Sequence, residues 1–262
     1  MQLILRPGML LVAMLLLGAC ATAPYTGRSQ LMMMNESEET RLGLEAAQEV
    51  LNTEHIETGT KRAFKVGTIG KRIASVADRP DFQWEFHTIK KDELNAFCLP
   101  GGKVFVYTGL IDMIGNSDDE LAAVMGHEIA HAIARHGAER ASQGMIANIG
   151  VAAAGIATSI ATKSDAAAST AVIGGSALLQ LGVLLPYSRL HESEADHIGV
   201  FLAAKAGYDP RASIKLWEKM GTVNKGKEPP AILSTHPLSD ARIKDLEKIM
   251  PEAMKHYATA RK

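Results

Sequence analysis

The sequence predicts an α+β fold that is mainly helical, with a small antiparallel sheet beside a helix that carries paired histidines. Residues 36–78 place apolar side chains at helical spacing, and helical patterns dominate after Ser117. Residues 82–86 instead alternate apolar and polar side chains, as a half-buried strand does. The 28 basic and 29 acidic residues nearly balance, which suits one globular domain over residues 36–262. The basic residues are scattered, so nucleic-acid binding is not expected.

The N-terminus predicts a lipoprotein signal peptide over residues 1–19. Arg6 precedes an apolar stretch from residue 9 to residue 17, which is too short to span a bilayer. The tetrapeptide Leu-Gly-Ala-Cys that ends at Cys20 resembles a bacterial lipobox. We therefore expect cleavage before Cys20 and lipidation of its thiol. An ordinary signal peptide or a short anchor is the alternative.

The residues that follow Cys20 predict where the chain is attached. Residues 20–35 are expected to form a tether from the lipid to the domain. Because Ala21 and Thr22 stand where inner-membrane lipoproteins carry an aspartate, we expect the periplasmic face of the outer membrane rather than the inner membrane. The second cysteine, Cys98, then has no internal partner, and a buried, unreactive thiol is expected, with an intermolecular disulfide as the alternative.

An HExxH motif, with His127, Glu128 and His131, lies in the helix predicted after Ser117. Ser117 and Glu120 have the spacing of a capping box, so the motif falls well inside this helix. Histidines four residues apart lie on one helix face, about 6 Å apart along the axis. Both imidazoles can therefore reach one zinc ion while Glu128 polarises a metal-bound water. A surface helix that contains this pattern by chance is the alternative.

The same helix does not supply a third zinc ligand. One class of zinc proteases has the pattern HExxHxxGxxH, but Gly137 occupies the third histidine position here and Ala134 occupies the glycine position. His136 is one residue short, and we expect it to be an ordinary surface or core residue. Gly137 is instead a plausible helix stop.

A second helical pattern, which ends at Gly207, supplies the better candidates. Glu192 and Asp196 lie four residues apart and can face the same side. One carboxylate could bind zinc while the other accepts the free N–H of a ligand histidine. Glu194 is expected to be solvated or salt-bridged, and His191 should point about 100° away from Glu192. A charged helix surface is the alternative for this segment.

An apolar segment separates these two helices. Residues 141–162 and 166–185 carry no charge and are rich in alanine, glycine, isoleucine and leucine. Small residues at close spacing favour a helical hairpin over residues 141–185 that packs on the domain, lies over the cleft or touches the lipid surface. Two transmembrane spans are the alternative.

Several ordered motifs together resemble those of the zinc endopeptidases related to the CAAX prenyl proteases. The resemblance covers roughly residues 36 to 248. Within this family it is strongest to the bacterial periplasmic lipoprotein members and the β-barrel assembly-enhancing proteases. The motifs are HExxH at residues 127–131, Glu-Ser-Glu-Ala-Asp at residues 192–196, Thr-His-Pro-Leu-Ser-Asp-Ala-Arg at residues 235–242, and the stretch from Asn95 to Leu110.

The resemblance implies a zincin-like metalloprotease domain that binds one Zn²⁺ ion. His127, His131 and Glu192 would be the zinc ligands. Glu128 would be the general base, and Asp196 would orient a ligand histidine.

The resemblance also implies how substrate is held. His236 would steady the oxyanion or occupy the open zinc position in a resting state. The stretch from Asn95 to Val106 would be an edge strand that aligns the substrate backbone. The expected substrate-binding residues are Asn95, Ala96, Phe97, Gly101 and Gly102.

These motifs predict a zinc endopeptidase tethered to the bacterial envelope through Cys20. Misfolded or stalled envelope and outer-membrane proteins are the expected substrates, and the envelope assembly machinery is a candidate partner. The alternative is a chaperone-like assembly factor for outer-membrane proteins with secondary or silent proteolysis, for which the tether and the apolar hairpin argue. A purely structural zinc site is disfavoured, because such sites are usually closed by four ligands rich in cysteine.

Overall fold

The computed structural model describes residues 20–147, 188–223 and 230–261. The chain divides into two compact units: Glu36–His136 with Leu185–Lys262, and Met1–Asn35 with Gly137–Leu184. The expected signal peptide and most of the expected apolar hairpin lie outside the described residues. In the part that is described, no helix is both long and apolar enough to cross a membrane.

The unit that contains the N-terminus includes a two-stranded antiparallel sheet, β1 (Cys20–Thr22) and β2 (Ser29–Leu31). Arg28 in the turn pairs with Glu139 at 2.6 Å, and the Met33 amide donates to Ser142 Oγ at 2.9 Å. Glu139 and Ser142 belong to a helical segment, residues 136–147. The segment expected to be a tether therefore contains a folded hairpin that is bonded to a helix.

The larger unit contains a four-stranded sheet in the order β3-β4-β6-β5. Its outer pairs are antiparallel, but the central strands β4 and β6 run parallel. The expectation of a purely antiparallel sheet is wrong for this pair, because β6 returns beside β4 in β4's own direction after the β5–β6 hairpin. The strands are β3 (Ile56–Glu57), β4 (Glu85–Ile89), β5 (Ala96–Leu99) and β6 (Lys103–Tyr107).

The strand expected over residues 82–86 begins three residues later, at Glu85. Phe82 and Trp84 precede it and pack their rings together, with centroids 5.1 Å apart. Trp84 stacks in turn on Phe86, the second residue of β4. The alternating aromatic pattern thus reflects a ring stack that leads into the strand.

The stretch from Asn95 to Val106, expected to be one edge strand, forms two strands and a tight turn. Of these two strands, β5 lies at a sheet edge and β6 lies inside the sheet. Gly101 and Gly102 form the turn with φ angles of 82° and 91°, a left-handed conformation that favours glycine. The Gly102 amide donates to the Leu99 carbonyl at 3.1 Å and closes the hairpin.

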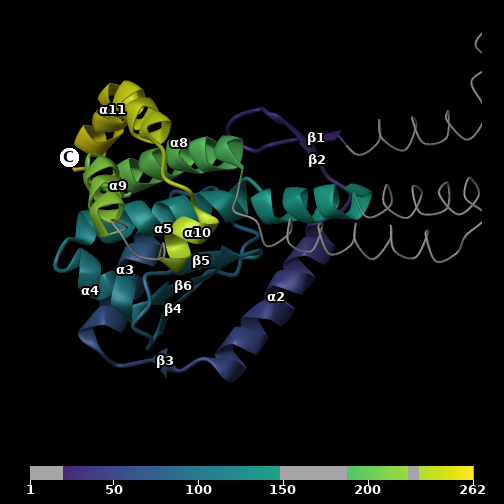
Figure 1. Cartoon of the computed structure of the whole chain (residues 1–262), viewed down its shortest axis with the longest axis horizontal. Coiled ribbons are helices and arrows are strands. Elements are labelled where there is room, and N and C mark those ends of the chain that lie inside the picture. The colour runs from purple at the N-terminus through teal and green to yellow at the C-terminus, as the bar shows by residue number, and fades with distance from the viewer. Residues whose placement is uncertain (1–19, 148–187, 224–229, 262) are drawn as a thin grey trace, which may run out of the picture. The chain divides into compact units, whose positions relative to one another are not determined.

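Helices cover both faces of the sheet (Figure 1). α2 (Glu36–Thr53) packs Ala47 into a small cluster with Ile89, Phe105 and Tyr107. α3 (Lys61–Ala74), α4 (Thr108–Ile114) and α5 (Asp118–Ile133) contribute to the main core with β5 and β6. The mainly helical α+β class is confirmed.

α5, which carries the HExxH motif, begins as predicted and ends early. Ser117 is its N-cap, and the Ser117 hydroxyl accepts the Glu120 amide at 3.1 Å. The helix ends at Ile133 rather than near Gly137, because Arg135 takes a φ of 60°. An Arg135–Glu39 ion pair of 2.6 Å ties this turn to α2.

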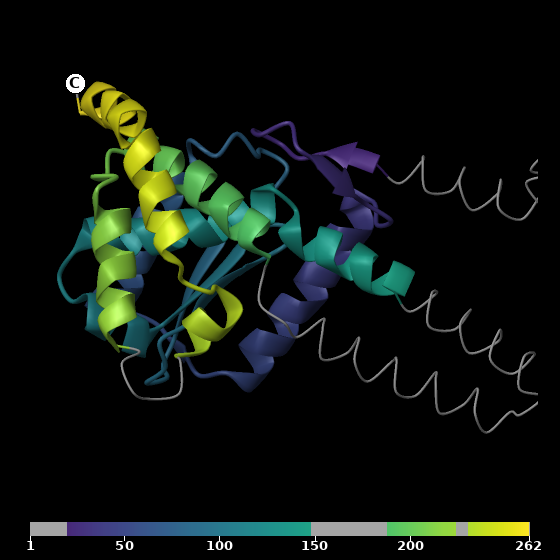
Figure 2. The same cartoon turned by 45° about the horizontal axis from the view of Figure 1, so that its top comes forward.

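α8 (Arg189–Lys205) lies alongside α5, and α11 (Asp240–Ala260) lies beyond α8, as Figures 1 and 2 agree. A methyl group added to Gly126 of α5 would lie 2.8 Å from the Gly199 carbonyl of α8. One added to Gly199 would lie 2.8 Å from the His127 amide. The two helix backbones therefore touch one residue away from the first motif histidine.

Two shorter helices connect α8 to α11. α9 (Ala212–Val223) packs Leu216, Trp217 and Met220 into the core. α10 (Ala231–Thr235) begins beside the sheet, where the Ile232 amide donates to the Leu94 carbonyl at 3.1 Å. This bond fixes the short helix that delivers His236.

Candidate metal centre

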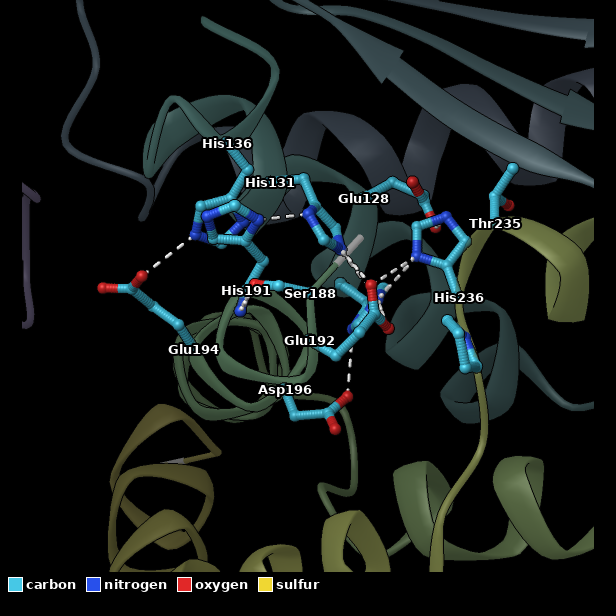
Figure 3. A network of polar contacts seen from close by, with 12 residues as sticks. Glu128, His131, His136, Ser188, His191, Glu192, Glu194, Asp196, Thr235 and His236 are labelled. Atoms are coloured by element: carbon cyan, nitrogen blue, oxygen red, sulfur yellow. Dashed lines mark hydrogen bonds and ion pairs between the residues drawn. The ribbon is translucent and has the colours of Figure 1, made fainter. Parts of the chain in front are cut away.

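Four buried side chains from three helical segments converge on one point (Figure 3). His127 and His131 come from α5, Glu192 from the first turns of α8, and His236 from the end of α10. One nitrogen or oxygen atom from each lies within 4.8 Å of the other three. These are the four residues that the sequence predicted as ligands or as the histidine near the metal.

The ring nitrogens and carboxylate oxygens of these residues face one another at close range. His127 Nε2 lies 3.1 Å from His131 Nε2 and 3.3 Å from His236 Nδ1. Glu192 Oε1 lies 3.3 Å from His131 Nε2 and 3.0 Å from His236 Nδ1. Lone pairs that converge in a buried place are costly without a cation between them. Imidazole nitrogens and a carboxylate are also the donors that zinc prefers, so the residues fit this ion.

Asp196 orients His127. Its Oδ1 lies 3.0 Å from His127 Nδ1, which leaves His127 Nε2 facing the other candidate ligands. Burial alone would lower the pKa of His127, but the hydrogen bonds to Asp196 and Glu192 outweigh it and raise the pKa to about 9. Burial would raise the pKa of Glu192, yet the three histidines hold it well below its ordinary value.

Glu128 directly follows His127 on α5 and is also buried. Its Oε1 is 3.6 Å from His236 Nε2. Burial raises the pKa of Glu128, while His236 and His127 partly oppose that shift. A carboxyl group with a raised pKa accepts a proton more readily, which suits a general base.

Arg242 is a member of the site that the sequence reasoning missed. Its guanidinium bonds both oxygens of Asp196 at 2.7 Å and lies 2.8 Å from Glu192 Oε2. Its carbon Cζ stacks 4.1 Å above the Trp217 ring. The available signal was the pair of carboxylates on one face of α8, because two buried negative charges need a cation beside them.

His136 and Glu194 are also closer to the site than expected. His136 is fully buried, and its Nδ1 lies 2.9 Å from His131 Nδ1. Its Nε2 lies 3.0 Å from an oxygen of Glu194, which is 6% exposed rather than solvated. His191 stacks on the His136 ring with centroids 4.5 Å apart.

The expected substrate-binding residues lie on β5 and its turn rather than in the donor cluster. The Asn95 carbonyl accepts the Tyr107 amide, and Phe97 pairs with Phe105. Because strand residues alternate, the backbone groups of Ala96 and Cys98 point away from β6, toward the open edge. The Ala96 amide is taken by the Asn95 side chain at 3.0 Å. Gly101 and Gly102 form the β5–β6 turn, and the left-handed backbone of this turn accounts for both glycines.

Cys98 is partly buried, whereas the sequence predicted a buried thiol. Among the described residues it forms no disulfide. Burial and the negative charge of Glu128 raise its pKa well above the ordinary value, so the nucleophilic thiolate form is disfavoured. The influence of Glu128 also shows that Cys98 lies on the side of β5 that faces α5.

An HExxH helix, a distant carboxylate and an edge strand beside them are the features of a zinc metalloprotease domain. Residues 60–250 match the model of Peptidase family M48, and the chain belongs to that family. The expected resemblance at the level of family is therefore confirmed.

Curated relatives show how far the similarity extends. The chain is 40% identical over 195 residues to mitochondrial metalloendopeptidase OMA1 of Schizosaccharomyces pombe, covering 72% of this chain and 53% of the relative. It is 30% identical to the Saccharomyces cerevisiae protein of the same name, covering 93% and 75%. It is 34% identical to the beta-barrel assembly-enhancing protease of Escherichia coli O157:H7, and the match covers 69% of this chain and 37% of the relative. The chain thus spans about half the length of the curated relatives it matches.

The comparison overturns the predicted location at the periplasmic face of an outer membrane. Relatives from yeasts, a plant and mammals are all named as mitochondrial enzymes. The prediction rested on residues 1–22, with the lipobox that ends at Cys20 and the two residues after it, whereas the similarity to these relatives extends over 195 residues or more. A short motif carries less information about the compartment than similarity over most of the chain.

Proposed function

We propose that the protein is a zinc endopeptidase in which His127, His131 and Glu192 hold the metal and Glu128 is the general base. The observation that carries this proposal is the convergence of the donor atoms within 4.8 Å beside a buried carboxyl group. Zinc, when bound, supplies a Lewis acid that polarises the scissile carbonyl and lowers the pKa of a water molecule.

Glu128 moves the proton in this scheme. Its carboxylate accepts a proton from the attacking water and then delivers it to the departing amine nitrogen. His236 lies between Glu128 and Glu192, with one ring nitrogen toward each. His236 would either be a fourth donor to the metal in a resting state or donate from its ring to the developing oxyanion.

Substrate binds in extended form along the free edge of β5. The Cys98 amide and the carbonyls of Ala96 and Cys98 face this edge and can pair with a peptide backbone. Such pairing recognises an extended chain rather than a particular side chain. Proteins that have lost or not yet gained their fold are therefore the preferred substrates.

The physiological substrates proposed are misfolded or stalled membrane proteins, and the partner proposed is their assembly machinery. Support comes from the names of the relatives, which include a beta-barrel assembly-enhancing protease. Removal of residues 1–19 and lipidation at Cys20 would hold the M48 domain, residues 36–262, at a membrane. Metabolic labelling with a radioactive fatty acid tests this attachment: label should enter the wild type and be lost in Cys20→Ser.

A protease assay under metal control tests the proposed function. Purified protein should cleave an unfolded casein substrate, lose this activity in 1,10-phenanthroline, and regain it with added zinc. Protein that binds one zinc ion yet cleaves no unfolded substrate would contradict the proposal. The chaperone-like alternative would then be favoured if Glu128→Gln rescued a deletion strain as well as the wild type does.

A further inference from the structure

The two motif histidines are supported in different ways. His127 is oriented directly by the carboxylate of Asp196. His131 has a second imidazole in the corresponding place, because His136 Nδ1 lies 2.9 Å from His131 Nδ1. The far nitrogen of His136 reaches Glu194 at 3.0 Å. Figure 3 shows this chain of contacts from Glu194 through His136 to His131.

We propose that His136 and Glu194 form a hydrogen-bond relay that holds His131 in its zinc-binding tautomer and orientation. This inference rests on the proposed zinc site. It assigns His136 and Glu194 as positioning residues that act on zinc retention rather than on the reacting atoms.

If His131 binds zinc, the hydrogen bonds allow only one placement of the ring protons of His131 and His136. His131 Nε2 faces the other donors and must keep a lone pair to bind zinc, so its proton is on Nδ1. His136 Nδ1 must then accept that proton's hydrogen bond, which leaves its own proton on Nε2. The Nε2–H donates to the Glu194 carboxylate. Each group in the chain is satisfied with both imidazoles neutral and Glu194 ionised.

The fold places His136 for this task. In a continuous helix a residue five positions after His131 would point about 140° away from it. Here α5 ends at Ile133, and the left-handed turn at Arg135 redirects the chain. His136 thereby returns to His131, and the stacked ring of His191 restricts its rotation.

Partners of this kind are worth about 10–100-fold in metal affinity when they are removed. His136→Phe keeps the ring and its packing but leaves the buried His131 N–H without its acceptor. His191→Phe is the matched control. It makes the same substitution at the buried histidine whose ring stacks on His136, and this histidine is not one of the three residues of the relay. His136→Asn restores an acceptor for His131 but does not reach Glu194.

Zinc affinity, measured by competition with a chromophoric chelator, is the deciding readout. We expect the Kd to rise about 10–100-fold in His136→Phe, to recover partly in His136→Asn, and to stay near wild type in His191→Phe. Thermal unfolding in EDTA measures stability without bound metal, and it should fall more in His136→Phe, which loses the buried hydrogen bonds to His131 and Glu194, than in His191→Phe. Equal zinc affinity of the wild type and His136→Phe would overturn the relay, as would an equal loss in the two phenylalanine variants.

Long-range ¹H–¹⁵N spectra of the zinc-loaded wild type read the tautomers directly. The relay requires the proton of His131 on Nδ1 and that of His136 on Nε2. A proton on His136 Nδ1 would rule it out. Failure of the wild type to bind zinc at all would instead count against the proposed function, so the two failures are distinguishable.

Discussion

α5 and the pair α8–α11 contribute to one centre in different ways. α5 carries two imidazoles and the carboxyl group of Glu128 within five consecutive residues. α8 and α11 instead bring two carboxylates together with Arg242, which lies 46 residues from Asp196 in the chain. The general base and two of the ligands are therefore local in sequence, whereas the groups that fix Glu192 depend on tertiary contacts. A change at Glu128 should remove chemistry but keep the metal, and changes at Glu192 or Arg242 should remove the metal or the fold.

The largest expected effect is on the α5 side, at Glu128. Glu128→Gln keeps the size of the side chain but removes the proton acceptor. We expect kcat on an unfolded substrate to fall about 10²–10⁴-fold, the usual contribution of a general base. Zinc content measured by atomic absorption should stay at the wild-type level. Wild-type turnover by this variant would show that another group accepts the proton.

Among the residues of α8 and α11, Arg242 should give the largest effect, which is a loss of stability. Arg242→Met leaves Asp196 and Glu192 buried without their cation, a loss of about 3–5 kcal/mol in the free energy of unfolding. Urea denaturation in EDTA measures this loss without a contribution from metal. Arg242→Lys keeps the positive charge but not the bidentate hydrogen bonding to Asp196. Its stability should therefore lie between that of the wild type and that of Arg242→Met. A loss below about 1 kcal/mol in Arg242→Met would contradict the assigned role.

The backbone contact between α5 and α8 can be changed at Gly126. Gly126→Ala places a methyl group 2.8 Å from the Gly199 carbonyl and should cost about 1–3 kcal/mol of stability. The control is Gly67→Ala on α3, where an added Cβ meets no described atom within 4 Å. That change should stabilise by up to about 1 kcal/mol through helix propensity. Equal effects of the two substitutions in thermal unfolding would show that the close backbone contact is unimportant.

The smallest effects test the two helix starts separately. The Ser117 hydroxyl accepts the Glu120 amide at 3.1 Å, and the Ser188 hydroxyl accepts the His191 amide at 3.2 Å. Loss of either cap in Ser117→Ala or Ser188→Ala should cost about 1 kcal/mol. Replacement by threonine should retain most of the stability. A cost near zero in urea denaturation would show that the helix concerned is fixed by packing alone.

The local part of the site could be predicted from the sequence. The positions of His127, Glu128 and His131 follow from one helical turn, and the cap at Ser117 fixes where that helix begins. Glu192 and Asp196 could be selected because their spacing places both on one helix face. These predictions rest on periodicity, which is a property of neighbouring residues.

The remaining part depends on contacts that periodicity does not report. The role of Arg242 arises where α11 packs on α8, and the place of His136 arises from the turn at Arg135. If α5 continued as a regular helix through residue 136, His136 would point about 140° away from His131. The parallel pairing of β4 and β6 likewise follows from how the β5–β6 hairpin inserts, which the alternation of side chains does not specify.

A crystal structure of the zinc-loaded protein, with an anomalous difference map recorded at the zinc edge, tests the central claim most directly. We predict one strong peak about 2.0–2.2 Å from His127 Nε2, His131 Nε2 and a carboxylate oxygen of Glu192. Glu192→Gln should weaken or abolish this peak in crystals grown with the same zinc concentration. A peak bound elsewhere, or one that keeps full height in Glu192→Gln, would contradict the account.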